Sequence, residues 1–215
     1  MSTKKIAIFV SGTGSNARVM IDNFRSEAFY EGGASSRLQS SQPTVNSQPA
    51  TTIEVALVVS NNPAAKALEM AATKGIATLV VHKKTFRETE EVLETLREFG
   101  VEFIVLAGFL WLMPTYLVQA YVGRMVNIHP ALLPKYGGKG MYGMHVHRAV
   151  HAASEPESGI TIHYVNEHYD EGAIIYQAAT SLLATDTPED IAAKVLQLEH
   201  DNYSRVVKEI LLGKD

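Results

Sequence analysis

Four short apolar runs in the first half of the chain alternate with segments of helical periodicity, and this alternation limits the possible folds most strongly. The runs cover residues 6–10, 55–59, 77–81 and 103–106, and they are rich in β-branched side chains. Strands that are apolar at almost every position are typical of a parallel sheet covered on both faces. The sequence therefore predicts an α/β fold of the Rossmann-like, doubly wound kind, with a mostly parallel sheet and helices on both faces.

The segments between these runs carry the apolar faces that helices need for packing on a sheet. In the clearest of them, Val92, Leu93, Leu96 and Phe99 make one apolar face, and charged residues make the other. A last helix is predicted to begin after Thr187, because threonine is a good N-cap and the proline that follows suits the first helical turn. A carboxylate three residues later stands at the capping-box position.

The second half of the chain has a mixed pattern. Residues 158–165 and part of 173–179 alternate apolar and polar side chains, which predicts later strands that are partly antiparallel. The segment 31–52 differs, because it is rich in Ser, Gln, Pro and Gly and has few large apolar residues. We expect a flexible surface insertion there, within a single domain that spans residues 1–215.

The composition is that of an ordinary globular protein and argues against several classes of function. Hydrophobic residues make up 46% of the 215 residues, and the formal net charge of −4 gives no broad basic surface for nucleic acid. The absence of cysteine excludes disulfides, thiolate metal sites and a cysteine nucleophile. No apolar stretch suits a signal peptide or approaches the roughly 20 residues of a membrane helix. We expect a cytoplasmic protein that acts on small molecules, as a monomer or homodimer.

A glycine-containing loop, Ser11-Gly12-Thr13-Gly14-Ser15-Asn16, directly follows the first predicted strand and opens a helix. Its backbone N–H groups can turn toward an anion, and the helix N-terminus adds a favourable dipole. With Ala17 the loop also fits a loose dinucleotide pattern, which expects an acidic residue at the end of the second strand. That strand ends with Ser60-Asn61-Asn62 instead. The pattern therefore favours a loop that binds the phosphate of a ligand other than a dinucleotide. The alternative is a tight turn that binds no ligand.

The stretch 125–136 offers a candidate catalytic pair. If it begins as a strand, Asn127 and His129 lie on one face, and Pro130 ends the strand. An amide donor beside a protonatable imidazole can stabilise a developing oxyanion. The alternative is a hydrogen-bonded asparagine and a structural histidine near a turn.

Asp170 lies in a predicted turn, where carboxylates are usually solvated. Asp170 is a candidate functional residue only if its side chain lies next to His129, because a carboxylate there would orient the imidazole and raise its pKa. His145 and His147 have the alternation of a two-ligand metal site, to which His129 and His163 could contribute. Because the chain lacks cysteines and a clear spacing of carboxylates, we favour a role for these histidines in a loop or at the substrate over a role as metal ligands.

An ordered set of motifs resembles the phosphoribosylglycinamide formyltransferase family. The motifs are Ser-Gly-Thr-Gly-Ser-Asn (11–16), Val-Ser-Asn-Asn (59–62), Leu-Ala-Gly-Phe (106–109), Asn-Ile-His-Pro-Ala-Leu-Leu-Pro-Lys-Tyr (127–136), Gly-Ile-Thr-Ile-His (159–163), Tyr-Asp-Glu-Gly (169–172) and Gln-Leu-Glu-His (197–200). The resemblance covers nearly the whole chain except the Ser/Gln-rich segment, and the specific signal is the ordered set rather than any one motif. It implies the α/β formyltransferase fold.

The resemblance also implies a reaction and a site. The formyl group of 10-formyltetrahydrofolate, the co-substrate, would pass to the glycine amine of glycinamide ribonucleotide in purine synthesis, without a metal or a covalent enzyme intermediate. Asn127, His129 and Asp170 match the catalytic residues. The positions that match ribonucleotide-binding residues are Gly14, Ser15, Asn16 and Glu199. The positions that match the folate pocket are Leu110, Trp111, Leu112, Met113 and Asn127.

The mechanism implied by the resemblance uses these residues on a neutral substrate amine, which attacks the formyl carbon. Asn127 would donate a hydrogen bond to the oxyanion, and protonated His129 would add charge. Asp170 would keep His129 protonated and help to move protons through water to the folate leaving nitrogen.

Two departures from the family pattern concern the substrate pocket. Many members have an arginine at the position of Trp111, and the segment 137–144 is longer than the usual link, with glycines that suggest a mobile flap. We also expect no C-terminal hairpin after the last helix. The competing readings are methionyl-tRNA formyltransferase or formyltetrahydrofolate hydrolase, whose additional domains would not fit this length, and a nucleotide-binding module without catalysis.

Overall fold

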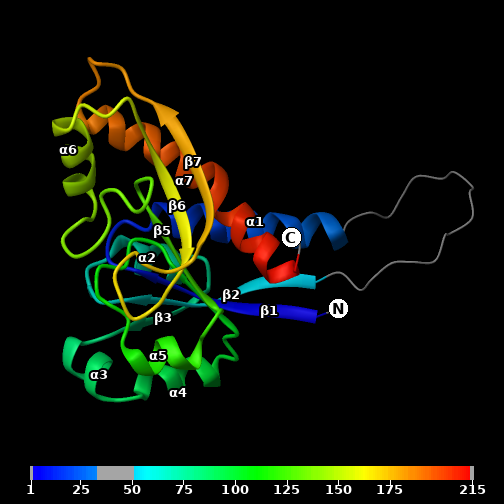
Figure 1. The fold of residues 1–215 in the computed structure, drawn as a ribbon. Coiled ribbons are helices and arrows are strands. Elements are labelled where there is room, and N and C mark those ends of the chain that lie inside the picture. The colour runs from blue at the N-terminus through cyan, green and yellow to red at the C-terminus, as the bar shows by residue number, and fades with distance from the viewer. Residues whose placement is uncertain (1, 33–50, 214–215) are drawn as a thin grey trace, which may run out of the picture.

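A seven-stranded sheet runs through the computed structural model, which describes residues 2–32 and 51–213. The strand order is β3-β2-β1-β4-β5-β6-β7 (Figure 1). The strands are β1 (Ser2–Val10), β2 (Thr51–Ser60), β3 (Ala77–Val80), β4 (Phe103–Leu106), β5 (Met125–His129), β6 (Glu157–Tyr164) and β7 (Ile174–Ser181). The first five strands are parallel, whereas β6 is antiparallel to β5 and to β7. This confirms the predicted mostly parallel sheet with later antiparallel strands.

Helices cover both faces of this sheet, as the doubly wound prediction requires. They are α1 (Ser15–Gly32), α2 (Lys66–Thr73), α3 (Lys83–Glu88), α4 (Glu91–Glu98), α5 (Thr115–Ala120), α6 (Met144–Ala152) and α7 (Pro188–Leu212). One core cluster joins buried side chains of α1, α2, α6 and α7 to the sheet, and a second joins those of α3, α4 and α5. In β1, Ile6 and Ile8 enter the first cluster while Ala7 and Phe9 enter the second, because strand side chains alternate.

The strand order creates a crevice at the carboxyl ends of β1 and β4. The chain leaves β1 toward β2 and β3, and it then returns to place β4 and β5 on the other side of β1. Ligands of open α/β sheets bind at such a reversal of strand order. Two hydrogen bonds fix the loops there, since the N–H of Ser11 donates to Gly108 O and the N–H of Leu110 donates to Ser11 Oγ.

Helix α7 begins as the sequence predicts. The Thr187 hydroxyl accepts from the N–H of Asp190, and the Asp190 carboxylate accepts from the N–H of Thr187, which completes a capping box. None of the helices in residues 2–32 and 51–213 is long and apolar enough to cross a membrane.

The segment predicted as a flexible insertion, 31–52, has ends that belong to regular elements. Residues 31 and 32 complete α1, and residues 51 and 52 open β2, where Thr51 and Thr52 pair with the first residues of β1. Residues 33–50 lie outside the described residues. The insertion therefore stays a prediction for those residues.

Candidate active site

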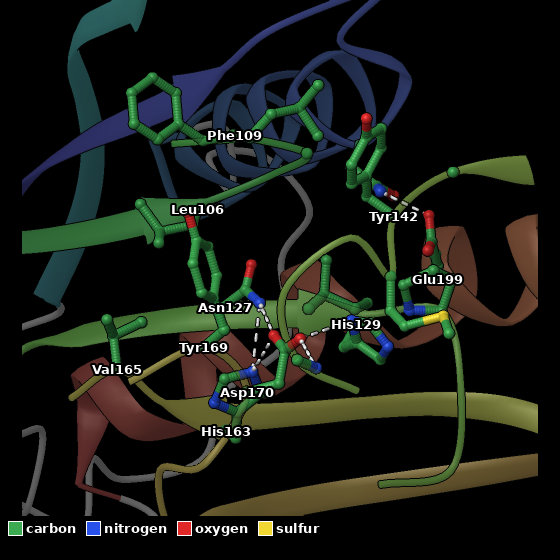
Figure 2. A pocket seen from close by; sticks show the side chains of 18 of the residues that line it. Leu106, Phe109, Asn127, His129, Tyr142, His163, Val165, Tyr169, Asp170 and Glu199 are labelled. Atoms are coloured by element: carbon green, nitrogen blue, oxygen red, sulfur yellow. Dashed lines mark hydrogen bonds and ion pairs between the residues drawn. The ribbon is translucent and has the colours of Figure 1, made fainter. Parts of the chain in front are cut away.

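A pocket of about 940 Å³ opens at the carboxyl ends of β1, β4 and β5 (Figure 2). Loops that follow these strands line it, together with the β6–β7 connection, the loop before α6 and one face of α7. This is the position expected for a ligand in a doubly wound sheet.

Strand β5 carries Asn127 and His129 to one wall of this pocket. The two side chains share a face because they are two residues apart on a strand. His129 is buried, with 3% of its surface exposed, and its Nε2 lies 2.8 Å from the carbonyl oxygen of Tyr136, to which it donates. The imidazole ring is therefore held in place by the backbone of the following loop.

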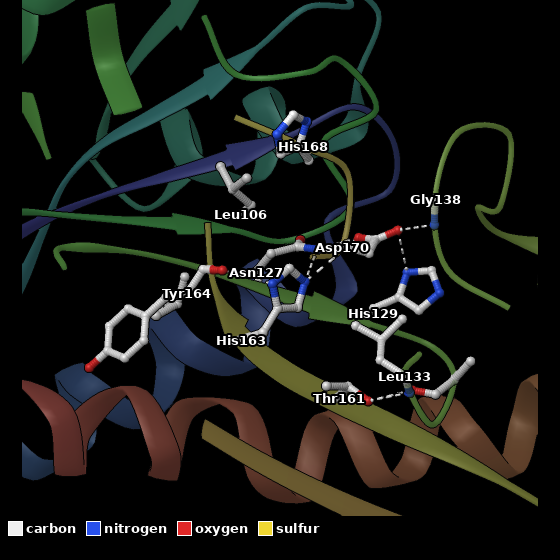
Figure 3. A network of polar contacts seen from close by, with 12 residues as sticks. Leu106, Asn127, His129, Leu133, Gly138, Thr161, His163, Tyr164, His168 and Asp170 are labelled. Carbon is white, nitrogen blue, oxygen red and sulfur yellow. Dashed lines mark hydrogen bonds and ion pairs between the residues drawn. The ribbon is translucent and has the colours of Figure 1, made fainter. Parts of the chain in front are cut away.

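The side chain of Asp170 lies next to that of His129, as a functional role for Asp170 requires. Its Oδ2 lies 3.5 Å from His129 Nδ1 and accepts a hydrogen bond of 2.9 Å from the N–H of Gly138 (Figure 3). The backbone of Asp170 has φ +58°, a left-handed conformation that is uncommon for a residue with a side chain. The turn thus directs a carboxylate inward, and its side chain is only 10% exposed.

His163 is a further member of this cluster, which sequence reasoning considered only as a metal ligand. It stands on β6 directly opposite Asn127 in the antiparallel register. Its Nε2 lies 3.1 Å from Asn127 Nδ2 and 3.6 Å from Asp170 Oδ1, and its Nδ1 donates to the carbonyl of Tyr164. Asn127 Nδ2 also lies 3.5 Å from Asp170 Oδ1. His163 and Asp170 therefore fix the amide of Asn127, and the register between β5 and β6 is the signal that would have identified His163.

The ionisation of this cluster differs from the expectation in one respect. Burial lowers the pKa of His129, His163 lowers it further, and the carboxylate of Asp170 and the carbonyl of Tyr136 oppose this only in part. The carboxylate of Asp170 therefore raises the pKa of His129 as expected, but desolvation outweighs this effect and the pKa lies below its ordinary value. For Asp170, burial raises the pKa, but the two histidines and the N–H of Gly138 together bring it below its ordinary value.

The glycine loop brings together three of the four residues assigned to the ribonucleotide. Ser15 and Asn16 begin α1 and line the pocket, and Asn16 Nδ2 donates a 2.7 Å hydrogen bond to Glu199 Oε2 of α7. Burial raises the pKa of Glu199, and the bond from Asn16 opposes this rise. The amide oxygen, Asn16 Oδ1, is an acceptor that is buried without a protein partner among the described residues. This wall therefore has polar groups that a ligand could satisfy.

Gly14, the fourth of these residues, shapes the loop and does not itself line the pocket. Its φ is +71°, and a Cβ at this position would lie 2.5 Å from the Cβ of Ala67 on α2. Both observations require glycine, because the conformation is left-handed and the neighbouring helix leaves no room.

The stretch assigned to folate lies on the other wall. Leu110, Trp111, Leu112 and Met113 all line the pocket. Trp111 packs against Phe86 and Phe109, with ring centroids 5.8 Å and 6.2 Å apart. This wall is apolar and aromatic, which suits the flat ring system of a folate.

The predicted His-x-His pair is not arranged as two ligands of one metal. His145 and His147 lie two residues apart on helix α6, so their side chains point in different directions. His147 is 6% exposed and lines the pocket, whereas His145 is exposed and contacts the ring of Tyr142 edge to face. The described residues contain no group of three or more potential ligands placed to hold a metal ion.

Comparisons with known proteins agree with this architecture. The family model described as "Formyl transferase" matches residues 28–207. The chain is 43% identical over 209 residues to "Phosphoribosylglycinamide formyltransferase, chloroplastic" of Arabidopsis thaliana, covering 95% of this chain and 64% of the plant protein. It spans 60% of the Vigna unguiculata protein of the same name.

A bacterial relative and a solved structure match over nearly their whole lengths. Phosphoribosylglycinamide formyltransferase of Bacillus subtilis is 33% identical, with 97% of this chain and 95% of the relative covered. The crystal structure of the Bacillus halodurans protein of that name is 34% identical, with a TM-score of 0.76 over 97% of this chain and 95% of that chain. The chain belongs to the phosphoribosylglycinamide formyltransferase family.

Proposed function

We propose that this chain transfers the formyl group of 10-formyltetrahydrofolate to the amine of glycinamide ribonucleotide. The products are formylglycinamide ribonucleotide and tetrahydrofolate, in de novo purine biosynthesis. The observation that carries the proposal is the cluster of Asn127, His129 and Asp170 between a polar wall that suits a phosphate and an apolar wall that suits a folate. Family membership supports the same activity.

We propose a place for each substrate on one of the two walls. The ribonucleotide phosphate would bind near Ser15 and Asn16 at the start of α1, where backbone N–H groups and the helix dipole favour an anion. Glu199, which Asn16 holds in the pocket, would accept hydrogen bonds from the ribose hydroxyls. The folate ring would lie against the stretch Leu110–Met113. The amine and the formyl group then meet beside the catalytic cluster.

The proposed chemistry forms one bond and breaks another at the formyl carbon. The amine nitrogen attacks this carbon, and the carbonyl oxygen becomes an oxyanion that Asn127 and protonated His129 stabilise. When the oxyanion collapses, the bond from the formyl carbon to folate N10 breaks. The proton that the amine loses ends on N10, carried through water with the help of Asp170. No electron is transferred and no residue becomes covalently modified.

The lowered pKa of His129 adds a condition to this scheme. At neutral pH the buried ring is neutral before substrate binds, because desolvation disfavours its charge. Negative charge on the formyl oxygen adds to that of Asp170 and favours the imidazolium. We therefore infer that His129 gains its charge as the oxyanion forms, by taking up through water the proton that the attacking amine loses. It gives this proton up, through water, to folate N10 when the oxyanion collapses.

The proposal is tested by incubating the chain with 10-formyltetrahydrofolate, with and without glycinamide ribonucleotide, and following folate absorbance. A transferase gives turnover that depends on the ribonucleotide. Turnover without ribonucleotide would identify a formyltetrahydrofolate hydrolase, and no turnover in either case would identify a binding module. Either of these results contradicts the proposal.

The setting of the enzyme is part of the same proposal. We propose that it acts in the cytoplasm on small molecules alone, without nucleic acid, membrane or a bound metal, as a monomer or homodimer. The plant relatives are named as chloroplastic, so a related protein works in another compartment.

A further inference from the structure

Among the described residues that line the pocket, a single one carries a permanent positive charge. Within residues 2–32 and 51–213, Lys139 is the only lysine or arginine in that lining, where Asp170 and Glu199 are both acidic. In the proposed reaction both substrates are anions, since the ribonucleotide carries a phosphate and the folate carries carboxylates. The position of this one lysine therefore bears on which substrate anion is neutralised.

The backbone next to Lys139 is anchored by a hydrogen bond, whereas its side chain forms no ion pair with the described residues. The preceding residue, Gly138, donates its N–H to Asp170 Oδ2, which anchors the loop next to the catalytic carboxylate. Gly138 and Gly140 on either side both have φ +92°, so the lysine stands at the apex of a glycine turn. Its side chain is exposed, and none of the ion pairs formed within the described part of the chain includes it.

The packing of its neighbours places the loop that carries Lys139 on the same face of the sheet as α1 and α7, which carry Asn16 and Glu199. Tyr136 and Met141, which flank the lysine, pack against the core cluster shared by α1, α6 and α7. Trp111 packs against the cluster on the opposite face of the sheet. In Figure 2, Tyr142 of the same loop lies on the side of Glu199, away from Phe109.

We propose that Lys139 binds the phosphate of the ribonucleotide and makes the enzyme selective for a phosphorylated acceptor. This inference rests on the proposed function. The loop at Ser15 and Asn16 offers N–H groups and the helix dipole, worth about half an elementary charge, whereas a phosphate monoester carries about −1.5 to −2. A lysine at the tip of a flexible four-carbon chain supplies a full charge that can follow the phosphate as it enters.

The test compares Lys139→Gln with the unaltered chain on two ligands, glycinamide ribonucleotide and its dephosphorylated nucleoside. We expect the Kd for the ribonucleotide, measured by calorimetry, to rise about tenfold, as for the loss of one charge-assisted hydrogen bond. Binding of the nucleoside should not change, and added salt should weaken ribonucleotide binding less in the variant. Lys139→Arg should restore most of the affinity. Lys84→Gln, which removes the same charge from an exposed position on α3, is the matched control and should bind normally.

Three results would overturn the inference. One is an unchanged Kd for the ribonucleotide in Lys139→Gln. A second is an equal loss for ribonucleotide and nucleoside, which would mean that the lysine only positions the loop. The third is a raised KM for 10-formyltetrahydrofolate alone, which would assign the charge to the folate carboxylates. If the unaltered chain lacks ribonucleotide-dependent turnover, the proposed function itself is wrong. If the unaltered chain turns over normally and Lys139→Gln binds the ribonucleotide equally well, only the inference about Lys139 is wrong.

Discussion

At the scale of single residues, Asp170 connects the most parts of the site. Its carboxylate contacts His129 and His163 and accepts from the N–H of Gly138. Asp170→Asn keeps the shape but removes the charge, so we expect kcat to fall about 100- to 1000-fold while ribonucleotide binding is retained. Steady-state kinetics and calorimetry would measure both. Glu171→Gln, an exposed neighbouring carboxylate, is the control, and near-normal turnover of Asp170→Asn would remove Asp170 from the mechanism.

His163 should act through Asn127 rather than on the substrate directly. Its ring accepts from Asn127 Nδ2, so His163→Ala would release an amide that must be aligned with the oxyanion. We expect kcat to fall about tenfold to a hundredfold, since small misplacements of reacting groups have effects of this size. His151→Ala, at an exposed position on α6, should have no effect. A normal kcat with a raised KM for either substrate would instead make His163 a binding residue.

The sequence was informative about residues only where a local pattern applied. Strand alternation was enough to place Asn127 and His129 on one face. The partnership of Asp170 with His129 needed the three-dimensional path of a turn, and that of His163 with Asn127 needed the register between two strands. The effect of Asp170 on the pKa of His129 was predicted, but the larger opposing effect of burial was not, because a strand pattern does not reveal how completely a ring is desolvated.

At the scale of elements, the turn between β1 and α1 depends on its contact with α2. Gly14→Ala would place a methyl group 2.5 Å from the Cβ of Ala67 in a left-handed conformation. We expect this variant to lower the free energy of unfolding by about 1–3 kcal/mol and to weaken ribonucleotide binding. Urea denaturation would measure the first effect. Gly12→Ala is the matched control, because nothing lies within 4 Å of its added methyl group, and equal stability of the two variants would contradict the account.

Many strands and helices could be predicted because the spacing of their apolar residues was clear. The apolar runs became β1 to β4, and the capping residues marked the start of α7. Helix α6 was not predicted, since His145-Val146-His147 was weighed as a possible metal-ligand pair and then favoured for loop or substrate roles, without a helix there. Short helices with few apolar residues have no pattern strong enough to separate them from loops.

At the scale of the whole molecule, two buried histidines make stability depend on pH. Burial lowers the pKa of both His129 and His147 in the folded state, so below about pH 6.5 the unfolded chain binds more protons. The stability that the two neutral histidines contribute is therefore fully present above that pH. It is lost as the pH falls toward their lowered pKa values in the folded state. The depressed pKa of Asp170 acts only at lower pH, since its stabilisation is lost below about pH 4.

Urea denaturation at about pH 7.5 and pH 5.5 would measure this dependence. We expect the unaltered chain to lose on the order of 1 kcal/mol over this range, and His147→Gln to lose less because glutamine does not titrate. His151→Gln, which changes an exposed histidine, should follow the unaltered chain. An equal loss in His147→Gln would contradict the assignment.

The order of the strands is the property of the whole molecule that the sequence could not supply. Alternating strands and helices predicted a doubly wound sheet, but the placement of β4 beside β1 follows from packing between distant segments. That placement creates the crevice in which Asn16, Asn127 and Glu199 line one pocket. The walls assigned to the two substrates are therefore consequences of the topology.

We propose that the formyl group passes directly from folate to the ribonucleotide amine at the site of Asn127, His129 and Asp170. A single-turnover reaction with 10-formyltetrahydrofolate labelled with ¹³C in its formyl group tests it most directly. We expect the label to appear on the amine of the ribonucleotide, and Asp170→Asn to slow its appearance about 100-fold or more. Release of labelled formate with the ribonucleotide unchanged, or equal rates in the two proteins, would contradict it.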